Sequence, residues 1–218
     1  MSIGNLGEKS LHASLKQYLV QPGDCIEHNV GGYIVDIVRG DLLIEIQTRN
    51  FARLKTKLNR LLKNHPVVVV YPIASARWIV RQDKSGAQLS RRKSPKKGSL
   101  LELFHELVYI PHLINHPGFS IEAVMVHEQQ IWCDDGAGSW RRKKWSILDR
   151  QLLHVEARRV FRSSGDYIAL LPDDLPEQFT THDLPKAHAG KMVYALREMG
   201  AIKQTGKRGR AYLYQIAR

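Results

Sequence analysis

The stretch Cys25–Thr48, CIEHNVGGYIVDIVRGDLLIEIQT, contains the pattern that decides the fold. Apolar residues recur at every second position, and two short turns, Gly31-Gly32 and Gly40-Asp41, divide the stretch into three segments. Such a period is typical of strands, and glycine turns of this length join neighbouring strands in hairpins. The stretch therefore predicts three consecutive antiparallel strands.

The second turn determines which residues of the last two strands face each other. If it is a two-residue turn, Arg39 pairs with Leu42, and counting back along both strands places Asp36 opposite Glu45. Gln47 follows Glu45 by two positions, so it lies on the same face of the sheet. We therefore expect two carboxylates and an amide side by side on neighbouring strands.

Directly opposed carboxylates lie about 5 Å apart and repel each other unless a cation or a proton intervenes. A carboxylate among apolar neighbours is also costly unless it is paired or bound to a metal ion. Here apolar residues occupy both faces of the two strands: Tyr33, Val35, Ile37, Leu42, Ile44 and Ile46 on one, and Ile34, Val38 and Leu43 on the other. We therefore expect Asp36 and Glu45 to bind Mg²⁺ or Mn²⁺, rather than to form an exposed polar face without an ion.

The elements around this stretch follow a defined order. A helical pattern over Glu8–Val20 precedes it, and a helical pattern over 50–65 and the apolar run VVVVY follow it. With D-x(8)-E-x-Q across the second and third strands, residues from roughly 5 to 73 resemble the core of the PD-(D/E)XK, or restriction-endonuclease-like, nuclease superfamily. The resemblance implies an α/β fold, with a mixed sheet flanked by helices, and Mg²⁺-dependent hydrolysis of DNA.

One residue departs from the pattern of the superfamily, because Gln47 stands where a lysine is usual. An amide cannot act as a base or supply a charge, so Gln47 is expected to position the attacking water. The alternative is a nuclease-like protein that has lost its activity and binds DNA or has a regulatory role.

Two residues are candidates for a third carboxylate at this site. In the superfamily the first helix often supplies an additional acid, and Glu8 is the residue that matches it; the alternative for Glu8 is a favourable place near the start of a helix. If Gly31-Gly32 is also a two-residue turn, Val30 pairs with Tyr33 and Glu27 lies opposite Asp36. Both candidates remain open.

The composition favours a polyanionic partner. The 218 residues include 33 Lys and Arg against 21 Asp and Glu, which gives a formal charge of +12 and a pI near 9.8. No apolar run is long enough to span a membrane, and the first residues lack the apolar core of a secretion signal. The two cysteines, Cys25 and Cys133, predict buried or half-buried free thiols and a cytoplasmic protein.

Two basic segments precede the C-terminal part. Residues 82–99 show no apolar periodicity and are expected to form a loop, either solvated or gripping phosphates, with these basic residues: Arg91, Arg92, Lys93, Lys96 and Lys97. The segment WRRKKW at 140–145 places Arg141 and Arg142 beside tryptophans, which either stack on bases or fix a hairpin.

The C-terminal part, residues 151–218, is expected to be a domain separate from the nuclease-like domain, residues 1–150. Its order of short helix, turn, helix and two strands around a basic tip resembles a winged helix-turn-helix domain. That resemblance implies contacts with the major groove and the DNA backbone. The residues concerned are Lys191, Tyr194 and Arg197 on the second helix, and Lys207, Arg208 and Arg210 on the wing.

Together these features predict a cytoplasmic, metal-dependent endonuclease that acts on nucleic acid, with double-stranded DNA as the expected substrate and no membrane partner. An RNA nuclease is a further alternative. Cleavage of both strands would favour a homodimer, because it often requires two active sites.

Overall fold

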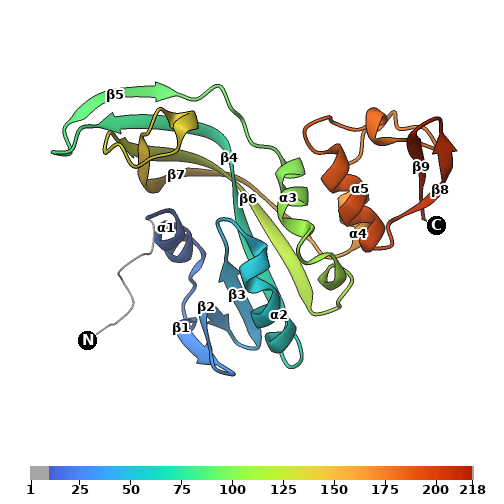
Figure 1. Ribbon diagram of the computed structural model, residues 1–218. Coiled ribbons are helices and arrows are strands. Elements are labelled where there is room, and N and C mark those ends of the chain that lie inside the picture. Colours follow the sequence, from blue (N-terminus) through green and yellow to red (C-terminus); the bar gives the residue numbers. More distant parts are fainter. Residues whose placement is uncertain (1–9, 218) are drawn as a thin grey trace. The chain divides into compact units, whose positions relative to one another are not determined.

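The computed structural model describes residues 10–217, which form an α/β structure around a large mixed sheet flanked by helices, as predicted (Figure 1). The seven-stranded sheet has the order β1-β2-β3-β4-β6-β7, with β5 paired to β4, and β8 and β9 form a separate hairpin. The strands are β1 (Cys25–Val30), β2 (Tyr33–Arg39), β3 (Leu42–Ile46), β4 (Val67–Gln82), β5 (Gln88–Lys93), β6 (Phe119–Cys133), β7 (Ser146–Phe161), β8 (Ile202–Arg208) and β9 (Ala211–Ile216).

The helices are short. The α-helices are α1 (Ser10–Leu19), α2 (Lys55–Leu61), α3 (Phe104–Leu107), α4 (Ser164–Ile168) and α5 (Ala189–Glu198). The 3-10 helices are η1 (Phe51–Leu54), η2 (Leu100–Leu103), η3 (Pro111–Leu113), η4 (Trp140–Arg142) and η5 (Thr181–Asp183).

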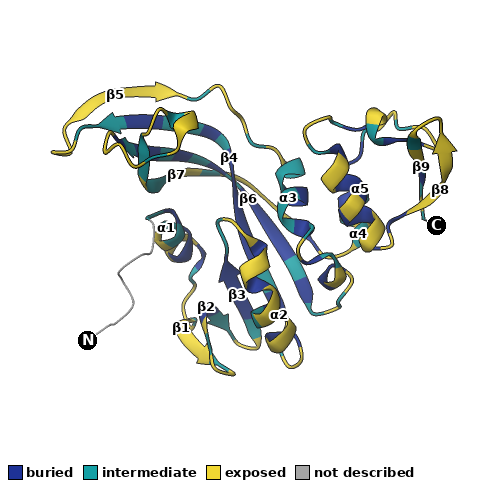
Figure 2. Cartoon of the chain, in the orientation of Figure 1, coloured by how far each residue is buried: buried dark blue, intermediate teal, exposed yellow. Residues whose placement is uncertain are grey.

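The three-stranded meander has the predicted register. Val30 pairs with Tyr33 across the first turn, and Arg39 pairs with Leu42 across the second. The glycines of both turns have positive φ, a conformation that residues with a Cβ rarely adopt. β1 is exposed along almost its whole length, whereas β3 is largely buried (Figure 2). β3 therefore lies inside the sheet and β1 at its edge.

The chain crosses from β3 to β4 through η1 and α2. The two strands are parallel, and Leu43 pairs with Val67 and Ile46 with Val70. A parallel connection of this kind needs a crossover element, and α2 provides it with its buried leucines, Leu58 among them. The helical pattern over 50–65 is thus occupied by η1 and α2, and the apolar run VVVVY belongs to β4.

Residues 82–99 do not form the predicted loop. β4 continues through Pro72 to Gln82, and the chain then turns back into β5, which pairs with β4 in antiparallel fashion. Trp78 faces Lys93 across this pair, and Val80 faces Arg91. All residues of β5 are exposed, so no apolar face marks the strand in the sequence.

β6 confirms the strand predicted over 119–132, whereas β7 was not predicted. Most of β7 is exposed or half-buried, and only Phe161 at its end is buried, so the strand lacks a clear apolar period. Asp149 on β7 holds the start of α1, because its carboxylate accepts hydrogen bonds from the Ser10 backbone N (3.1 Å) and the Ser10 Oγ (2.5 Å).

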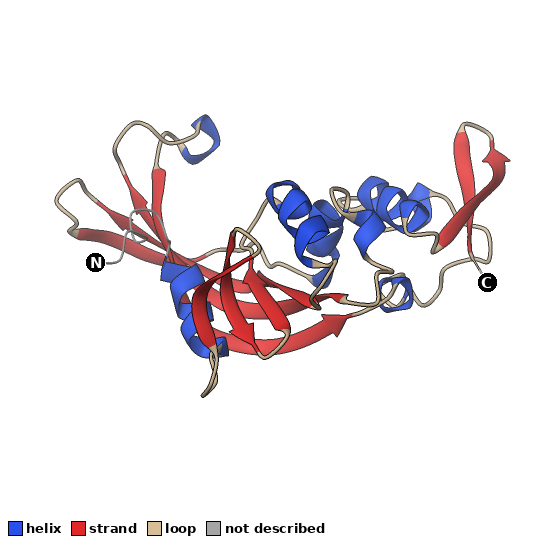
Figure 3. Cartoon of the chain, turned by 90° about the horizontal axis from the view of Figure 1, so that it is seen from below, coloured by secondary structure: helices blue, strands red, loops and turns tan. Residues whose placement is uncertain are grey.

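The C-terminal segment contains the elements predicted for it (Figure 3). The Thr180 Oγ1 caps η5 by accepting a hydrogen bond from the His182 N at 3.1 Å. α5 buries its apolar face, and β8 and β9 form an antiparallel hairpin. Phe179 and Tyr214 exchange backbone hydrogen bonds of 2.9 and 2.8 Å, which joins the chain before η5 to the hairpin.

The described residues divide into two units. Unit 1 takes its residues from Met1–Asp24, Pro72–Ser99 and Val124–Arg158, and unit 2 takes them from Cys25–Tyr71, Leu100–Ala123 and Arg159–Arg218. β4, β6 and β7 each contain residues of both units. The boundary expected after residue 150 falls inside β7, and the helical C-terminal segment begins after Phe161.

Within residues 10–217, no helix is both long and apolar enough to cross a membrane. The two thiols are free, but only Cys133 is buried; Cys25 is exposed on β1, because β1 is an edge strand. The expectation of burial was therefore wrong for Cys25.

Candidate active site

Asp36 and Glu45 lie where β2 and β3 separate. The paired residues of β2 and β3 run from Arg39–Leu42 to Ile37–Ile44. At the next position, that of Asp36 and Glu45, hydrogen bonds to side chains replace those between the two backbones. The Asp36 Oδ2 accepts a hydrogen bond from the Ile46 N at 2.8 Å, and the Asp36 backbone N–H donates to the Glu45 carboxylate. The structure thus brings the two acids together across the two strands, as the predicted register requires.

Glu45 is a buried carboxylate, with only 5% of its side chain exposed. Burial raises the pKa of Glu45 from its usual 4.5 to about 7, the Lys57 ammonium opposes this rise, and the Asp36 carboxylate adds to it. Because desolvation favours the neutral acid, Glu45 exchanges its proton near neutral pH. A cation beside it would favour the ionised form.

Lys57 is the residue of this site that the sequence analysis did not single out. Its Nζ lies 2.5 Å from the Glu45 Oε1 and donates a hydrogen bond to the Ile34 backbone O at 2.5 Å. The ammonium therefore joins the backbone of β2 to the acid of β3, where the two strands separate. Lys57 belongs to α2, so a residue distant from the E-x-Q motif supplies the charge that Gln47 lacks.

A signal for Lys57 was present in the helix pattern. Lys57 follows Leu54 by three residues and precedes Leu61 by four, so it lies on the same helical stripe as these buried leucines. A lysine within an apolar stripe predicts a buried partner for its charge. Helical spacing alone does not identify Glu45 as that partner.

Gln47 is held by the turn that follows β3. Its Nε2 donates to the Arg49 O at 2.5 Å and to the Asn50 O at 3.2 Å, and its backbone N donates to the Val70 O of β4 at 2.9 Å. The amide nitrogen therefore anchors the entry to η1.

The two candidates for a third carboxylate differ in their outcome. Glu27 lies between the pairs Ile26–Ile37 and His28–Val35, which is the position opposite Asp36. However, its backbone is left-handed (φ 50°), it leaves the strand pairing, and it is exposed. Glu8 lies outside the described residues.

The donor set suits a hard divalent cation with few protein ligands. Among residues 10–217, no group of three or more His, Cys, Asp or Glu side chains is arranged to hold a metal ion. Mg²⁺ commonly binds through one or two carboxylates and retains water for its other positions. Asp36 and Glu45 meet that lower requirement, and the Glu45 Oε1 is a buried oxygen that lies 2.5 Å from the Lys57 Nζ.

The basic residues expected to contact DNA lie on three parts of the chain. Arg91, Arg92 and Lys93 are on β5, and Lys96 and Lys97 follow it. All five are exposed residues of unit 1. Arg141 and Arg142 belong to η4, where the Arg141 guanidinium carbon lies 5.5 Å from the Trp140 ring centroid.

The remaining basic candidates belong to the C-terminal segment. On α5, Lys191, Tyr194 and Arg197 are exposed at intervals of three, on the side away from the buried residues. The Lys191 Nζ lies 3.0 Å from the His105 Nδ1 of α3. The tip of the β8–β9 hairpin carries Lys207, Arg208 and Arg210, all exposed. A hollow of about 370 Å³ lies against it, lined by Thr180, His182, Asp183, Arg208, Arg210 and Ala211.

Comparisons relate the chain to known proteins. Residues 9–162 match a family described as "Domain of unknown function (DUF8091)", and this match ends one residue after β7. A protein of Treponema pallidum (strain Nichols), described as an uncharacterized protein, is 36% identical over 220 residues, which covers 99% of this chain and 88% of the relative. No solved structure matches the chain. Because the family match spans more than half of the sequence, the chain belongs to the DUF8091 family.

Proposed function

We propose that the protein is a metal-dependent endonuclease that hydrolyses DNA phosphodiester bonds. The observation that carries this proposal is the meeting of Asp36, Glu45 and Lys57 at the separation of β2 and β3. Two acids and an ammonium that meet at the buried Glu45 match the groups that phosphodiester hydrolysis requires, which are ligands for a divalent ion and a positive charge near the phosphate.

Asp36 and Glu45 would hold the ion, and each is already fixed by the backbone of the other strand. A bound Mg²⁺ or Mn²⁺ would polarise the scissile phosphate and lower the pKa of a coordinated water. Lys57 would take the role of the lysine that the superfamily usually carries at the position of Gln47. Its three N–H donors suit a phosphate oxygen as well as the Glu45 carboxylate.

Gln47 is then a positioning residue. Because its Nε2 is bound to two carbonyls of the following turn, it holds the end of β3 on which Glu45 lies. This assignment differs from the sequence-based expectation that Gln47 orients the attacking water.

The arrangement of elements supports a restriction-endonuclease-like core. α1 precedes a meander in which β2 is antiparallel to β1 and β3, and α2 leads to β4, which is parallel to β3. This is the order of helix, three strands, helix and strand on which the resemblance rests.

The C-terminal segment supports a winged-helix domain that binds duplex DNA. α5 follows η5 in the manner of a recognition helix, and the β8–β9 hairpin carries a cationic tip in the place of a wing. Phe179 pairs with Tyr214 of β9, so a single residue lies beside this hairpin where a third strand would be. Arg197 on α5 and Arg208 and Arg210 on the wing would then contact the phosphates.

The test is cleavage of supercoiled plasmid in Mg²⁺ or Mn²⁺. We expect nicking by the full chain and a loss of at least about 100-fold for Asp36→Asn and Glu45→Gln, because each removes a charged ligand. Lys57→Gln should lose activity as well, whereas Lys55→Gln changes an exposed lysine of the same helix and should not. Asp41→Asn, in the exposed β2–β3 turn, is the control for the acids.

One observation favours a second function, that of an inactive nuclease-like DNA-binding protein. Lys57 already places a positive charge beside Glu45, so the acid has a cationic partner without an ion. On this reading the protein shifts DNA in a gel but never nicks it, and neither Mg²⁺ nor Mn²⁺ changes its stability. That combination of results would exclude the nuclease.

A further inference from the structure

A row of rings and cations crosses four strands of unit 1. On β5, the Lys93 Nζ lies 5.2 Å and the Arg91 guanidinium carbon 5.5 Å from the ring centroid of Trp78 on β4. The Trp78 ring lies 5.8 Å from the ring of His127 on β6, which lies 5.4 Å from the ring of His154 on β7. We call these five residues the aromatic row.

A line of amides lies beside the aromatic row. The Arg91 Nε donates to the Gln129 Oε1 at 3.1 Å, and the Gln129 Nε2 donates to the Gln151 Oε1 at 3.2 Å. Gln129 follows His127 by two residues on β6, so both side chains lie on one face of the strand. Amide groups hydrogen-bond readily to the edges of bases. Rings, cations and amides are thus side by side on this sheet.

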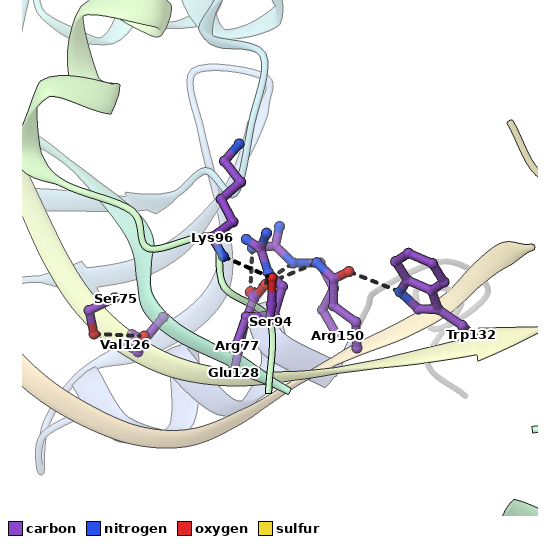
Figure 4. A network of polar contacts seen from close by, with 9 residues as sticks. Ser75, Arg77, Ser94, Lys96, Val126, Glu128, Trp132 and Arg150 are labelled. Carbon is purple, nitrogen blue, oxygen red and sulfur yellow. Dashed lines mark hydrogen bonds and ion pairs between the residues drawn. The ribbon is translucent and has the colours of Figure 1, made fainter. Parts of the chain in front are cut away.

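The strands that carry the row are fixed from their other face. Glu128 is fully buried, and its carboxylate lies 2.5 Å from the Arg77 Nε of β4 and 2.5 Å from the Arg150 Nη2 of β7 (Figure 4). Arg77 and Glu128 are the chain neighbours of Trp78 and His127, so they point to the opposite side. This three-residue clamp joins β4, β6 and β7, and it holds the rings in place before a ligand binds.

The charge of this part of the chain suits a polyanion. Within residues 10–217, no carboxylate forms an ion pair with Arg91 or Lys93, and the row meets an acid only at Glu156, whose Oε2 lies 3.7 Å from the His127 Nε2. Asp83 is the single acid of residues 72–99, against the basic residues Arg77, Arg81, Lys84, Arg91, Arg92, Lys93, Lys96 and Lys97. Phosphates would therefore be attracted to Arg91 and Lys93 without breaking an ion pair of either residue.

We propose that this face of unit 1 binds single-stranded DNA, with unpaired bases stacking on Trp78 and His154 and phosphates pairing with Arg91 and Lys93. A duplex is the poorer ligand, because its bases are stacked on each other and cannot reach the rings. The choice of DNA over RNA rests on the proposed function. The proposal that unpaired bases stack on this surface does not depend on that function.

The experiment measures binding of a fluorescein-labelled oligothymidylate of about 15 nucleotides to the full chain, by anisotropy in EDTA. We expect Trp78→Ala and His154→Ala each to weaken binding about 10-fold, because each removes a stacking surface. Arg91→Gln and Lys93→Gln should weaken binding and lower the salt slope by about 0.7 each. Lys84→Gln removes the same charge from the same hairpin but away from the row, and should have a smaller effect.

His154→Ala changes an exposed residue, so it carries the test if Trp78→Ala does not fold. The proposal is wrong if His154→Ala and Arg91→Gln bind like Lys84→Gln, or if Trp140→Ala, the exposed tryptophan of η4, causes the loss instead. It is also wrong if a duplex of equal length binds as tightly, or if oligouridylate binds more tightly. Asp36→Asn should leave this binding intact, so a failure of the nuclease is seen separately.

Discussion

Lys57 Nζ and Glu45 Oε1 lie 2.5 Å apart, and this contact joins helix α2 to strand β3 at a position where the pairing of β3 with β2 has ended. Burial favours the neutral form of Glu45, and the Lys57 ammonium of α2 favours the ionised form. The protonation state of Glu45, and with it the affinity of the proposed site for an ion, therefore depends on Lys57 and on pH.

Replacing Lys57 by methionine should destabilise the protein in a manner that depends on pH. At pH 8.5 the ionised Glu45 would remain buried without its partner, at a cost of roughly 2–4 kcal/mol; at pH 5.5 the neutral acid should reduce the cost to below about 1 kcal/mol. Urea unfolding at the two pH values measures the difference, with Lys55→Met as the matched control. Equal losses at both pH values would contradict the assignment.

The contribution of Glu45 to the stability of the wild-type protein should fall as the pH rises from about 4.5 to about 7. The pKa of Glu45 is about 7 in the folded state against 4.5 ordinarily, so the unfolded state releases its proton first. The contribution of this group is complete below pH 4.5 and is lost through pH 7, with a total of about 3 kcal/mol. Glu45→Gln should remove this part of the pH profile, whereas Asp41→Asn should retain it.

Divalent ions should stabilise the protein more at pH 8 than at pH 6. The ion must replace the proton on Glu45, and that proton is largely absent only above the pKa of about 7. At an ion concentration of about 100 times Kd, the stabilisation should reach about 2.7 kcal/mol. Thermal unfolding in Mn²⁺ and in EDTA measures it, and a shift that persists in Asp36→Asn would place the ion elsewhere.

Glu128→Gln should be among the most destabilising single substitutions in unit 1. It would leave the guanidinium groups of Arg77 and Arg150 without their shared carboxylate, at a cost of roughly 3–5 kcal/mol. Burial alone would raise the pKa of Glu128, but the two arginines more than offset this and lower it, so its contribution should be lost as the pH falls through its lowered pKa. Urea unfolding should show a much smaller loss for Glu156→Gln, whose side chain is half exposed.

Changes at the tip of the β8–β9 hairpin, the proposed wing, should weaken duplex binding and change its salt dependence. Lys207→Gln and Arg210→Gln should each lower the slope of log K against log salt by about 0.9, because each removes one phosphate contact. The Lys63→Gln variant, in the exposed turn before β4, is the charge control. An unchanged slope for both wing variants would indicate that the C-terminal segment has a different partner.

The meander could be predicted from the sequence because two features specify it together. Glycine turns fix the first pair of each hairpin, and the alternation of apolar residues fixes every later pair. That is why the opposition of Asp36 and Glu45 follows from counting. It is also why the distortion at Glu27 does not, since a left-handed residue inside a strand leaves no mark in the pattern.

β5 and β7 could not be predicted, because they lack the alternation of apolar residues that marks the meander. Both strands are mostly exposed, so their positions are filled by charged and polar residues that resemble those of a loop. Their pairing depends on neighbours that are distant in the sequence, and the aromatic row exists only once Trp78, His127 and His154 are brought together. The role of Lys57 could not be predicted for the same reason, because its partner Glu45 lies on β3 and not on its own helix.

The left-handed backbone at Glu27 has a consequence for the outer edge of the sheet. An edge strand presents unpaired N–H and C=O groups to which a second polypeptide can add, and this is a common origin of aggregation. At Glu27 the regular spacing of those groups is broken in the middle of β1. A regular backbone at Glu27 would restore the spacing that an added strand requires, so the distortion makes this edge a poorer template for misassembly.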